Sequence, residues 1–463
     1  MSQTTATVGS HVAIFAFPFA SHAAILLPVV HRLALSSPTT IFSFFTTLHS
    51  NKTLSSTCKH YLSLSNVRAF DLADGVPEGY LFTGKHQEDI ELFMSAGPVN
   101  LRKAVETAVA ETGKRVSCVV SDAFLWFTAD IAKELDVAWV PCWTSGVNSL
   151  SAHVYTDLIR EKIGVEGIEE HLDENLDFIP GMSKVRVRDL PEGVVFGNLQ
   201  SLFSNMLHQM GRKLPQADAV FLNCFEELDL TTTNDLKSKF KKFLNVGPFT
   251  LLSTLPPAEV PDRNGCLSWL DGQKKAASVA YVSFGTAVKL PPAEVIAIAE
   301  ALEADKVPFI WSLKENFQVD LPNGFKERTR SHGIVVPWAP QVDVLKHEAI
   351  GVFITHCGWN SMLESIVGGV PMICRPFFGD HRLNGRMIES VWEVGVNVED
   401  GKFTKDGLIR KLDLVLRQEG GEKMRKKIRK PKEDLLKAIG PKGSSVKNFR
   451  MLSEIVSRPK WVD

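Results

Sequence analysis

Residues 338–381 read WAPQVDVLKHEAIGVFITHCGWNSMLESIVGGVPMICRPFFGDH, and this stretch decides the expected fold. It holds two apolar runs of strand length, GVFITHCG (351–358) and VPMICRPF (370–377), on either side of a helical pattern that begins near Asn360. Buried strands joined by a helix are typical of a parallel sheet, because a parallel strand needs a long crossover connection. The stretch therefore predicts one strand–helix–strand unit of a wound α/β sheet.

The same alternation extends through both halves of the chain. The strands expected in the first half are residues 11–17, 40–47, 67–72, 117–122, 138–143 and 219–225, with helices at 23–35, 90–112, 125–135 and 201–214. The strands expected in the second half are residues 279–285, 307–313, 333–339, 351–358, 370–377 and 395–398, with helices beginning near Pro292, Gln341, Asn360, His381 and Thr404. Two such series predict two doubly wound parallel-sheet domains.

A proline-rich stretch separates the two series. Residues 251–265, LLSTLPPAEVPDRNG, contain three prolines, which exclude a continuous helix or a central strand. We expect a first domain over residues 1–248, a linker over 249–265 and a second domain over 266–443.

Composition narrows the class of protein. The 463 residues are 44% hydrophobic and 23% charged, as in ordinary folded domains, and the net charge of -1 argues against a nucleic-acid partner. Apolar stretches such as 12–20 are too short for a membrane span. Seven scattered cysteines indicate free thiols, and the N-terminus lacks the pattern of a signal peptide. A cytoplasmic protein is expected.

The sequence lacks the glycine-rich phosphate-binding motifs, and two further segments are interpreted as structural and not as binding sites. No GxGxxG follows a strand and no GxxxxGK[ST] occurs, which argues against an NAD-linked oxidoreductase. Residues 440–445, GPKGSS, are interpreted as a turn between helices. The basic run 423–432 is flanked by acidic residues and is interpreted as a solvated helix face, which Pro431 should kink or end.

The end of the strand at 351–358 carries the clearest chemistry. The strand ends at a glycine and the next helix opens with Trp359, Asn360 and Ser361, which places free backbone N–H groups and the positive end of the helix dipole together. This arrangement predicts an anion site. His356 and Ser361 would add side-chain donors for a diphosphate.

Residues on either side extend this site to a nucleoside. Glu364 lies one turn after Asn360 and could accept two hydrogen bonds from a ribose diol. Trp338 offers a flat face to a pyrimidine ring, and the backbone at Ala339 can bond the edge of the base. Together these groups predict a site for a nucleoside diphosphate.

In the first domain, His22 and Asp122 each stand at the carboxyl end of an expected strand. A carboxylate that accepts a hydrogen bond from one imidazole nitrogen fixes the tautomer and leaves the other nitrogen to take a proton. We expect His22 to be a general base and Asp122 its partner.

Residues 338–381 resemble, without a gap, the signature box of plant family 1 UDP-dependent glycosyltransferases. The resemblance covers nearly the whole chain and is closest to flavonoid and anthocyanidin 3-O-glycosyltransferases, through stretches such as DGVPEGY (74–80), HQEDIELF (86–93), WTSGVNSLSAHVYTDLIREKIG (143–164) and NFRMLSEIVS (448–457). It implies a GT-B fold of two facing Rossmann-like domains, with the sugar donor mainly on the second and the acceptor mainly on the first. It also implies that the last helix, within residues 444–463, packs back on the first domain.

The resemblance further implies roles at matched positions. It places Thr144 near the sugar, Asp380 at its ring hydroxyls, and Ser283 and Thr286 beside the phosphates, although these last two can equally serve a turn at Gly285. The expected donor-binding set is Ser283, Thr286, Trp338, Ala339, Gln341, His356, Trp359, Asn360, Ser361, Glu364, Asp380, His381 and Thr144. The expected acceptor-binding set is Ser21, Gln87, Phe124, His153, Phe203 and Phe378.

The implied reaction is inverting transfer of a hexose from a UDP-sugar, a co-substrate, to the 3-hydroxyl of a flavonol or anthocyanidin. No cofactor and no metal are expected, since no acidic pair ends a strand, and a monomer is expected. The box ends in His381, where most glucose-using relatives have glutamine and several galactose-using relatives have histidine, so UDP-galactose is favoured over UDP-glucose. Two alternatives stay open: a UDP-glucose-dependent enzyme acting on other small phenols, and a nucleotide-sugar-binding protein without turnover.

Overall fold

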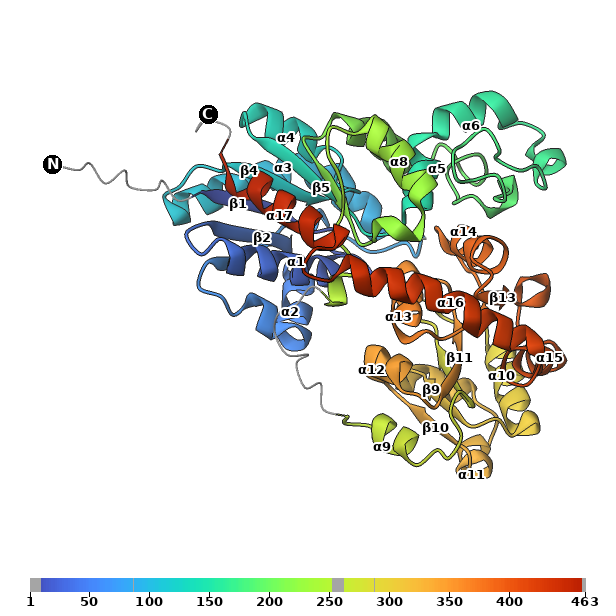
Figure 1. Cartoon of the computed structure of the whole chain (residues 1–463). Helices are drawn as coiled ribbons and strands as arrows, with labels where there is room; N and C mark the ends of the chain where they lie inside the picture. The colour runs from blue at the N-terminus through green and yellow to red at the C-terminus, as the bar shows by residue number, and fades with distance from the viewer. Residues whose placement is uncertain (1–9, 86, 252–261, 287, 460–463) are drawn as a thin grey trace. The chain divides into compact units, whose positions relative to one another are not determined.

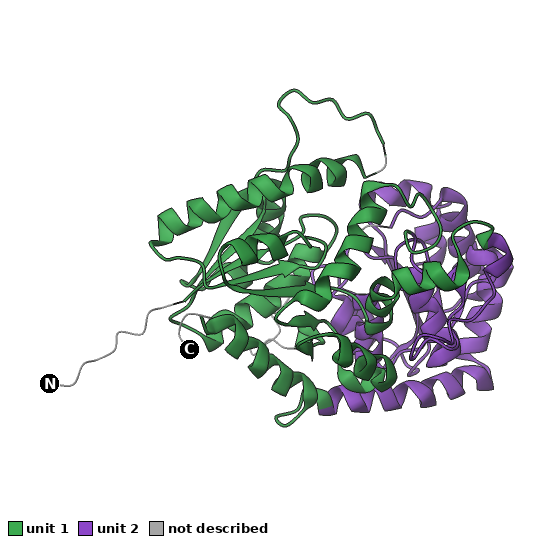
Figure 2. Cartoon of the chain, turned by 90° about the horizontal axis from the view of Figure 1, so that it is seen from above, with its two compact units in different colours: residues 1–168, 193–254, 438–463 green, residues 169–192, 255–437 purple. Residues whose placement is uncertain are grey.

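The computed structural model describes residues 10–85, 87–251, 262–286 and 288–459. Two parallel sheets organise them (Figure 1). The chain divides into two compact units, coloured separately in Figure 2. The first unit comprises the described residues of 1–168, 193–254 and 438–463, and the second those of 169–192 and 255–437.

A seven-stranded sheet forms the centre of the first unit, with every adjacent pair parallel and the order β3-β2-β1-β4-β5-β6-β7. Its strands are β1 (His11–Phe15), β2 (Ile41–Thr47), β3 (Val67–Leu72), β4 (Cys118–Asp122), β5 (Ala138–Trp143), β6 (Val220–Leu222) and β7 (Phe243–Asn245). Its α-helices are α1 (His22–Ser36), α2 (Leu48–Thr57), α3 (Glu88–Thr112), α4 (Thr128–Glu134), α5 (Val147–Val154), α6 (Thr156–Ile163), α7 (Leu202–Lys213), α8 (Leu230–Lys239) and α17 (Ser444–Ser457).

A six-stranded parallel sheet forms the centre of the second unit, in the order β10-β9-β8-β11-β12-β13. Its strands are β8 (Val279–Ser283), β9 (Phe309–Ser312), β10 (Gly333–Val336), β11 (Ile350–Thr355), β12 (Met372–Cys374) and β13 (Gly395–Asn397). Its helices are α9 (Cys266–Asp271), α10 (Pro292–Asp305), α11 (Phe325–Thr329), α12 (Gln341–Lys346), α13 (Trp359–Gly368), α14 (His381–Arg386), α15 (Lys405–Leu416) and α16 (Glu419–Ala438).

Most strands are buried because helices cover them, whereas the edge strand β3 has three exposed residues. Every residue of β1, β4, β5, β8 and β11 is buried, as expected for a parallel sheet covered on both faces. The helix α17 contributes Phe449, Leu452 and Val456 to the core that also contains Val12 and Ile14 of β1. The last helix is therefore an integral part of the first unit.

Strand order reverses once in each sheet. In the first sheet the reversal lies between β1 and β4, and in the second between β8 and β11. Ligands of such sheets bind outside the carboxyl ends of the strands at this point. The segments that follow these four strands are therefore the candidate sites.

The structure adds helices α2, α5, α6, α8, α9 and α11 to those expected, and it departs from the sequence-based expectations in three further ways. The strand β7, only three residues long, was not expected. Residues 169–192 belong to the second unit, not to a first domain spanning 1–248. The helix α16 continues through Pro431, so the proline does not end it, and only the expected kink stays a prediction.

Other features need only brief mention. Residues 252–261 of the expected linker lie outside the described residues. Residues 440–443 of the expected turn lie between α16 and α17, whereas Ser444 and Ser445 already belong to α17. All seven cysteines carry free thiols. Among the described residues, no helix is long and apolar enough to cross a membrane.

Candidate active site

The first unit brings His22 and Asp122 together. His22 is the first residue of α1, Asp122 is the last of β4, and the neighbouring strands β1 and β4 direct both to one edge of the sheet. The distance from Nδ1 of His22 to Oδ2 of Asp122 is 2.7 Å. Because an ionised carboxylate can only accept, Nδ1 carries the proton and Nε2 is left with a free lone pair. The pair is arranged as a base and its orienting acid.

Both members of the pair are held in place. The side chain of Asp122 is only 2% exposed, whereas that of His22 is 16% exposed. The other carboxylate oxygen of Asp122 accepts a hydrogen bond from the backbone N–H of Phe124, at 3.0 Å. Oγ1 of Thr144, which follows β5, lies 3.4 Å from Nδ1 of His22. Thr144, expected near a sugar, thus lies beside the histidine.

Aromatic rings surround the imidazole. The centroid of Phe124 is 4.8 Å from that of His22, and Phe17 is 5.2 Å away on an edge-to-face contact. Phe203 lies 6.2 Å from Phe124. The cluster continues through Phe19 and Phe93. The three rings of Phe17, Phe19 and Phe93 were missed in the sequence analysis, although FPFASH (17–22) places the first two directly before the histidine.

The other four expected acceptor residues lie on different elements of the two units. His153 is buried on α5, with its ring 5.6 Å from Trp143. Ser21 is exposed just before α1, and Gln87 precedes α3 in a left-handed backbone conformation with φ of 62°. Phe378 belongs to the second unit, where its half-exposed ring lies 4.7 Å from that of His381.

The second unit contains a pocket of about 390 Å³ at the carboxyl ends of β8 and β9. The expected donor residues that line it are Ser283, Thr286, Trp338, Ala339, Gln341 and Glu364. Trp338 is half exposed, so one face of its indole is available to a ligand. Lys314 also lines the pocket and donates a hydrogen bond to the carbonyl of Thr286, at 2.9 Å. Lys314 was not singled out from the sequence.

Gln341 organises one wall of this pocket. Its Nε2 donates to Oε2 of Glu364 at 2.7 Å and to the hydroxyl of Ser361 at 3.0 Å. Its Oε1 accepts from the buried hydroxyl of Tyr281, at 3.1 Å. Burial raises the pKa of Glu364 to about 7, with the Gln341 hydrogen bond acting in the opposite direction. The wall therefore offers an oriented carboxyl group that changes charge near neutral pH.

Two histidines meet after β11 and β12: the partly buried His356 follows β11, and the buried His381 begins α14 after β12. The rings of His356 and His381 meet edge to face, 4.9 Å apart. Burial lowers the pKa of His356 to about 3 and that of His381 to about 4, so both are neutral at ordinary pH. Nδ1 of each ring is buried and has no hydrogen-bond partner among the described residues.

Glycine is required on both sides of His356. A Cβ at Gly285 would lie 2.9 Å from the ring, and a Cβ at Gly358 would lie 2.3 Å from Nε2. Gly358 also precedes α13 without a side-chain cap, which leaves the first N–H groups of that helix to other partners. Trp359 is buried in the core and Asn360 follows it on the first turn. Trp359 can therefore serve a ligand only through its backbone.

The segment after β12 presents Asp380 and His381. Nδ2 of Asn384 donates to Oδ2 of Asp380 and to the carbonyl of Cys357, both at 2.9 Å. At the start of the segment, Arg375 pairs with the buried Glu294 of α10 at 2.7 Å. Neither Asn384 nor Arg375 was predicted, and both act by fixing the segment.

Comparisons with known proteins identify relatives of this chain. The family model described as UDP-glucoronosyl and UDP-glucosyl transferase matches residues 82–428. The chain is 59% identical to an anthocyanidin 3-O-glucosyltransferase of Vitis vinifera, covering 100% of both chains. It is 57% identical to a flavonol 3-O-glucosyltransferase of Arabidopsis thaliana (97% of this chain, 98% of that one) and 51% identical to an anthocyanidin 3-O-galactosyltransferase of Actinidia chinensis var. chinensis (96% and 97%).

One solved structure is similar over almost the entire chain. The crystal structure of a UDP-glucose: anthocyanidin 3-O-glucosyltransferase in complex with UDP superposes with a TM-score of 0.89 at 45% identity. The match covers 97% of this chain and 99% of that one.

The raised pKa of Glu364 predicts how stability varies with pH. The folded protein retains a proton that the unfolded chain loses above its ordinary pKa of 4.5, so burial of Glu364 costs stability as pH rises, until the folded group ionises near 7. The free energy of unfolding of Glu364→Gln, relative to that of the wild type, should therefore be about 2 kcal/mol larger at pH 8 than at pH 5. Urea denaturation at both pH values measures this gain. The control is Glu300→Gln on the exposed face of α10, and an equal gain in both variants would contradict the prediction.

Proposed function

Since the chain belongs to the UDP-glucoronosyl and UDP-glucosyl transferase family, we propose that it transfers a hexose from a UDP-sugar to the 3-hydroxyl of a flavonol or anthocyanidin. It is a glycosyltransferase with the GT-B fold. The acceptor class comes from its relatives, which are named for anthocyanidins and flavonols.

The observation that carries the proposal is the contact between His22 and Asp122. Nε2 of His22 takes the proton of the acceptor hydroxyl, and Asp122 stabilises the imidazolium that forms. The acceptor oxygen then attacks the anomeric carbon from the side opposite the diphosphate. A new C–O bond forms, the bond to UDP breaks, and UDP leaves with the electron pair, so the configuration inverts.

The pocket of the second unit supports UDP as the leaving group. We assign the face of Trp338 and the backbone of Ala339 to the uracil, and Glu364 with Gln341 to the ribose diol. The N-terminal end of α13 and the side chains around it would hold the diphosphate; these are Ser283, Thr286, His356, Asn360 and Ser361. Asp380, His381 and Thr144 are assigned to the hexose.

The rings around His22 support a flat aromatic acceptor. Phe124 and Phe203 were expected to form its walls, and Phe17 and Phe19 extend them. Aromatic side chains contribute large apolar contact area to a planar ligand. Ser21, Gln87 and His153 are assigned to the acceptor hydroxyls, and Phe378 to a further wall.

We also propose that the transfer needs no metal. Backbone N–H groups and neutral imidazoles can stabilise the departing diphosphate without an ion. The direct test is purified protein with a UDP-sugar and quercetin, scored for UDP release with and without acceptor and with and without EDTA. Acceptor-dependent release that EDTA leaves unchanged is expected. Tight UDP binding without product would instead favour a binding protein, and rescue of a chelated sample by Mg²⁺ would contradict the metal-free reaction.

We propose UDP-galactose as the preferred donor, with UDP-glucose next. The relatives include enzymes named for each sugar, so the support comes from His381. Its neutral ring supplies one hydrogen and one lone pair from a rigid plane, whereas glutamine supplies two hydrogens from a longer arm. A buried site built for one epimer rejects the other by leaving polar groups unpaired.

Removal of the base should abolish transfer but preserve nucleotide binding. His22→Ala should lower turnover at least about 100-fold, because a general base contributes that much or more. Asp122→Asn should also lower turnover severely, since the amide can hold the wrong tautomer. UDP affinity, measured by calorimetry, should stay at the wild-type value. The control is His49→Ala on the exposed face of α2, and near-normal turnover in His22→Ala would rule out the assignment.

Donor choice should depend on position 381. His381→Gln should reduce the ratio of kcat/KM for UDP-galactose to that for UDP-glucose by about tenfold or more. The two products have equal mass, so they are separated by chromatography. Arg382→Gln, an exposed neighbour on α14, serves as the control. Wild-type preference for glucose would overturn the donor proposal, and an unchanged ratio in His381→Gln would show that this position does not set it.

A further inference from the structure

Residues Glu169–Glu192 belong to the second unit, although the chain on both sides of them belongs to the first. We call this segment the strap. Its two arms are joined by an antiparallel bridge between Asn175 and Arg186 and by the hydrogen bond from the N–H of Leu176 to the carbonyl of Val185, at 2.9 Å. Its apolar side chains are buried, namely Leu176, Ile179, Met182, Val185, Val187 and Leu190. The strap is thus a packed element of the fold.

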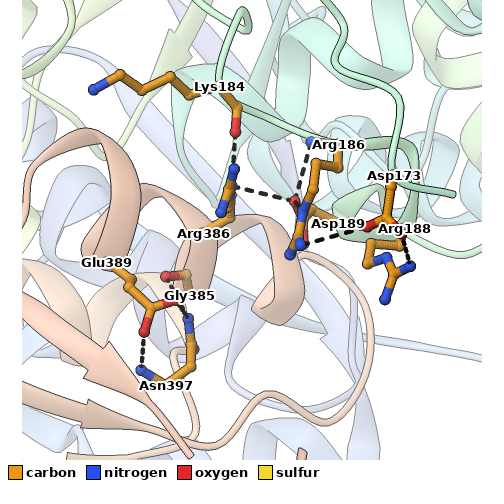
Figure 3. A network of polar contacts seen from close by, with 9 residues as sticks. All are labelled: Asp173, Lys184, Arg186, Arg188, Asp189, Gly385, Arg386, Glu389 and Asn397. Atoms are coloured by element: carbon orange, nitrogen blue, oxygen red, sulfur yellow. Dashed lines mark hydrogen bonds and ion pairs between the residues drawn. The ribbon is translucent and has the colours of Figure 1, made fainter. Parts of the chain in front are cut away.

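Arg386, the last residue of α14, joins that helix to the strap (Figure 3). Its Nε donates to the carbonyl of Lys184 at 2.7 Å and lies 3.5 Å from Oδ2 of Asp189. In the other direction, Nζ of Lys184 donates to the carbonyl of Ser390, in the turn that follows α14, at 3.1 Å. We call these contacts the clasp.

The charged groups of the clasp determine how α14 is oriented on the strap. Asp189 is only 6% exposed, and a buried carboxylate must be paired. Arg186 on the strap donates to both of its oxygens, each at 3.0 Å, and Arg386 supplies the second positive charge from α14. Charge-assisted hydrogen bonds of this kind are shorter and more directional than neutral ones. The clasp therefore holds α14 in one orientation on the strap.

The same short helix carries the residues assigned to the hexose. Asp380 precedes α14 and His381 is its first residue, whereas Arg386 is its last. Asn384 holds the helix from a second direction, through the carbonyl of Cys357. Because α14 has only six residues, we expect a movement of its Arg386 end to shift Asp380 and His381. The pocket assigned to the uracil and ribose is lined by Trp338, Glu364 and their neighbours, and no strap residue is among its lining residues.

We propose that Arg386 is a positioning residue, through which the strap sets the hexose-binding end of α14 without affecting the binding of UDP itself. This inference rests on the proposed function, in that it takes Asp380 and His381 to contact the sugar. Its physical basis is that an error of about 1 Å in the placement of contact groups can cost as much as about 100-fold in rate.

The test compares the binding of UDP-galactose, UDP-glucose and UDP in the absence of acceptor. Arg386→Met keeps the length of the side chain but removes its donors and charge. Calorimetry should show a Kd for the tighter-binding UDP-hexose that rises by about tenfold, with the Kd for UDP within about twofold of wild type. Arg188→Met is the matched control, because the guanidinium of Arg188 pairs with Asp173 within the strap. It should leave both Kd values unchanged.

The outcomes separate positioning from general support of the fold. Equal rises in the Kd for UDP and for the UDP-hexose would show a merely structural role, and unchanged values would show no role; either result overturns the proposal. Should Arg386→Met fail to fold, Arg386→Gln is judged by the same ratio of Kd values, and an unchanged ratio again overturns it. A wild-type protein that binds the UDP-hexose but transfers nothing to a flavonol would contradict the proposed function, and the binding ratio would remain readable.

Discussion

The reversal of strand order in each parallel sheet is the constraint on which the rest of the structure depends. At that point two neighbouring strands send their following segments in opposite directions, which leaves space at the edge of the sheet. In the first unit the space receives His22 from the start of α1, which follows β1, and Asp122 from the end of β4. In the second, it receives His356 after β11 and the turn at Gly285 after β8. The polar side chains that can bind or react with a ligand thus lie at the carboxyl ends of the strands, where the apolar core ends.

Burial then determines what these groups can do. His356 and His381 are neutral because the surrounding protein disfavours their charged forms, so they can donate and accept hydrogen bonds without adding charge. Burial also disfavours the charged form of Glu364, but for a carboxyl group this raises the pKa, so Glu364 keeps its proton to a higher pH. Gln341, held by Tyr281, shows that such groups also need an oriented neighbour. Charge state and orientation are therefore properties of the fold as well as of the residues.

The sequence predicted the elements that are apolar and long, and the residues that follow them. The strands around β1, β4, β8 and β11 and the residue pairs at their ends were within reach, because their position depends only on local pattern and sheet topology. The strand β7 was not predicted, since its three residues follow two lysines and are too few to show a pattern. Phe93, Asn384 and the strap were not either, because their partners are distant in sequence and only tertiary packing brings them together.

The strap has a consequence for how the chain is made. It leaves the ribosome as part of the first half of the protein, yet the helix that it grips, α14, is synthesised only after the linker and most of the second unit. Its contacts with α14 must wait until most of the second unit has been synthesised, and the first unit in turn receives α17 only after α16. A cut at the linker would likewise leave the strap on the wrong fragment. The two units are therefore interlaced in sequence, and neither half of the gene encodes a whole one.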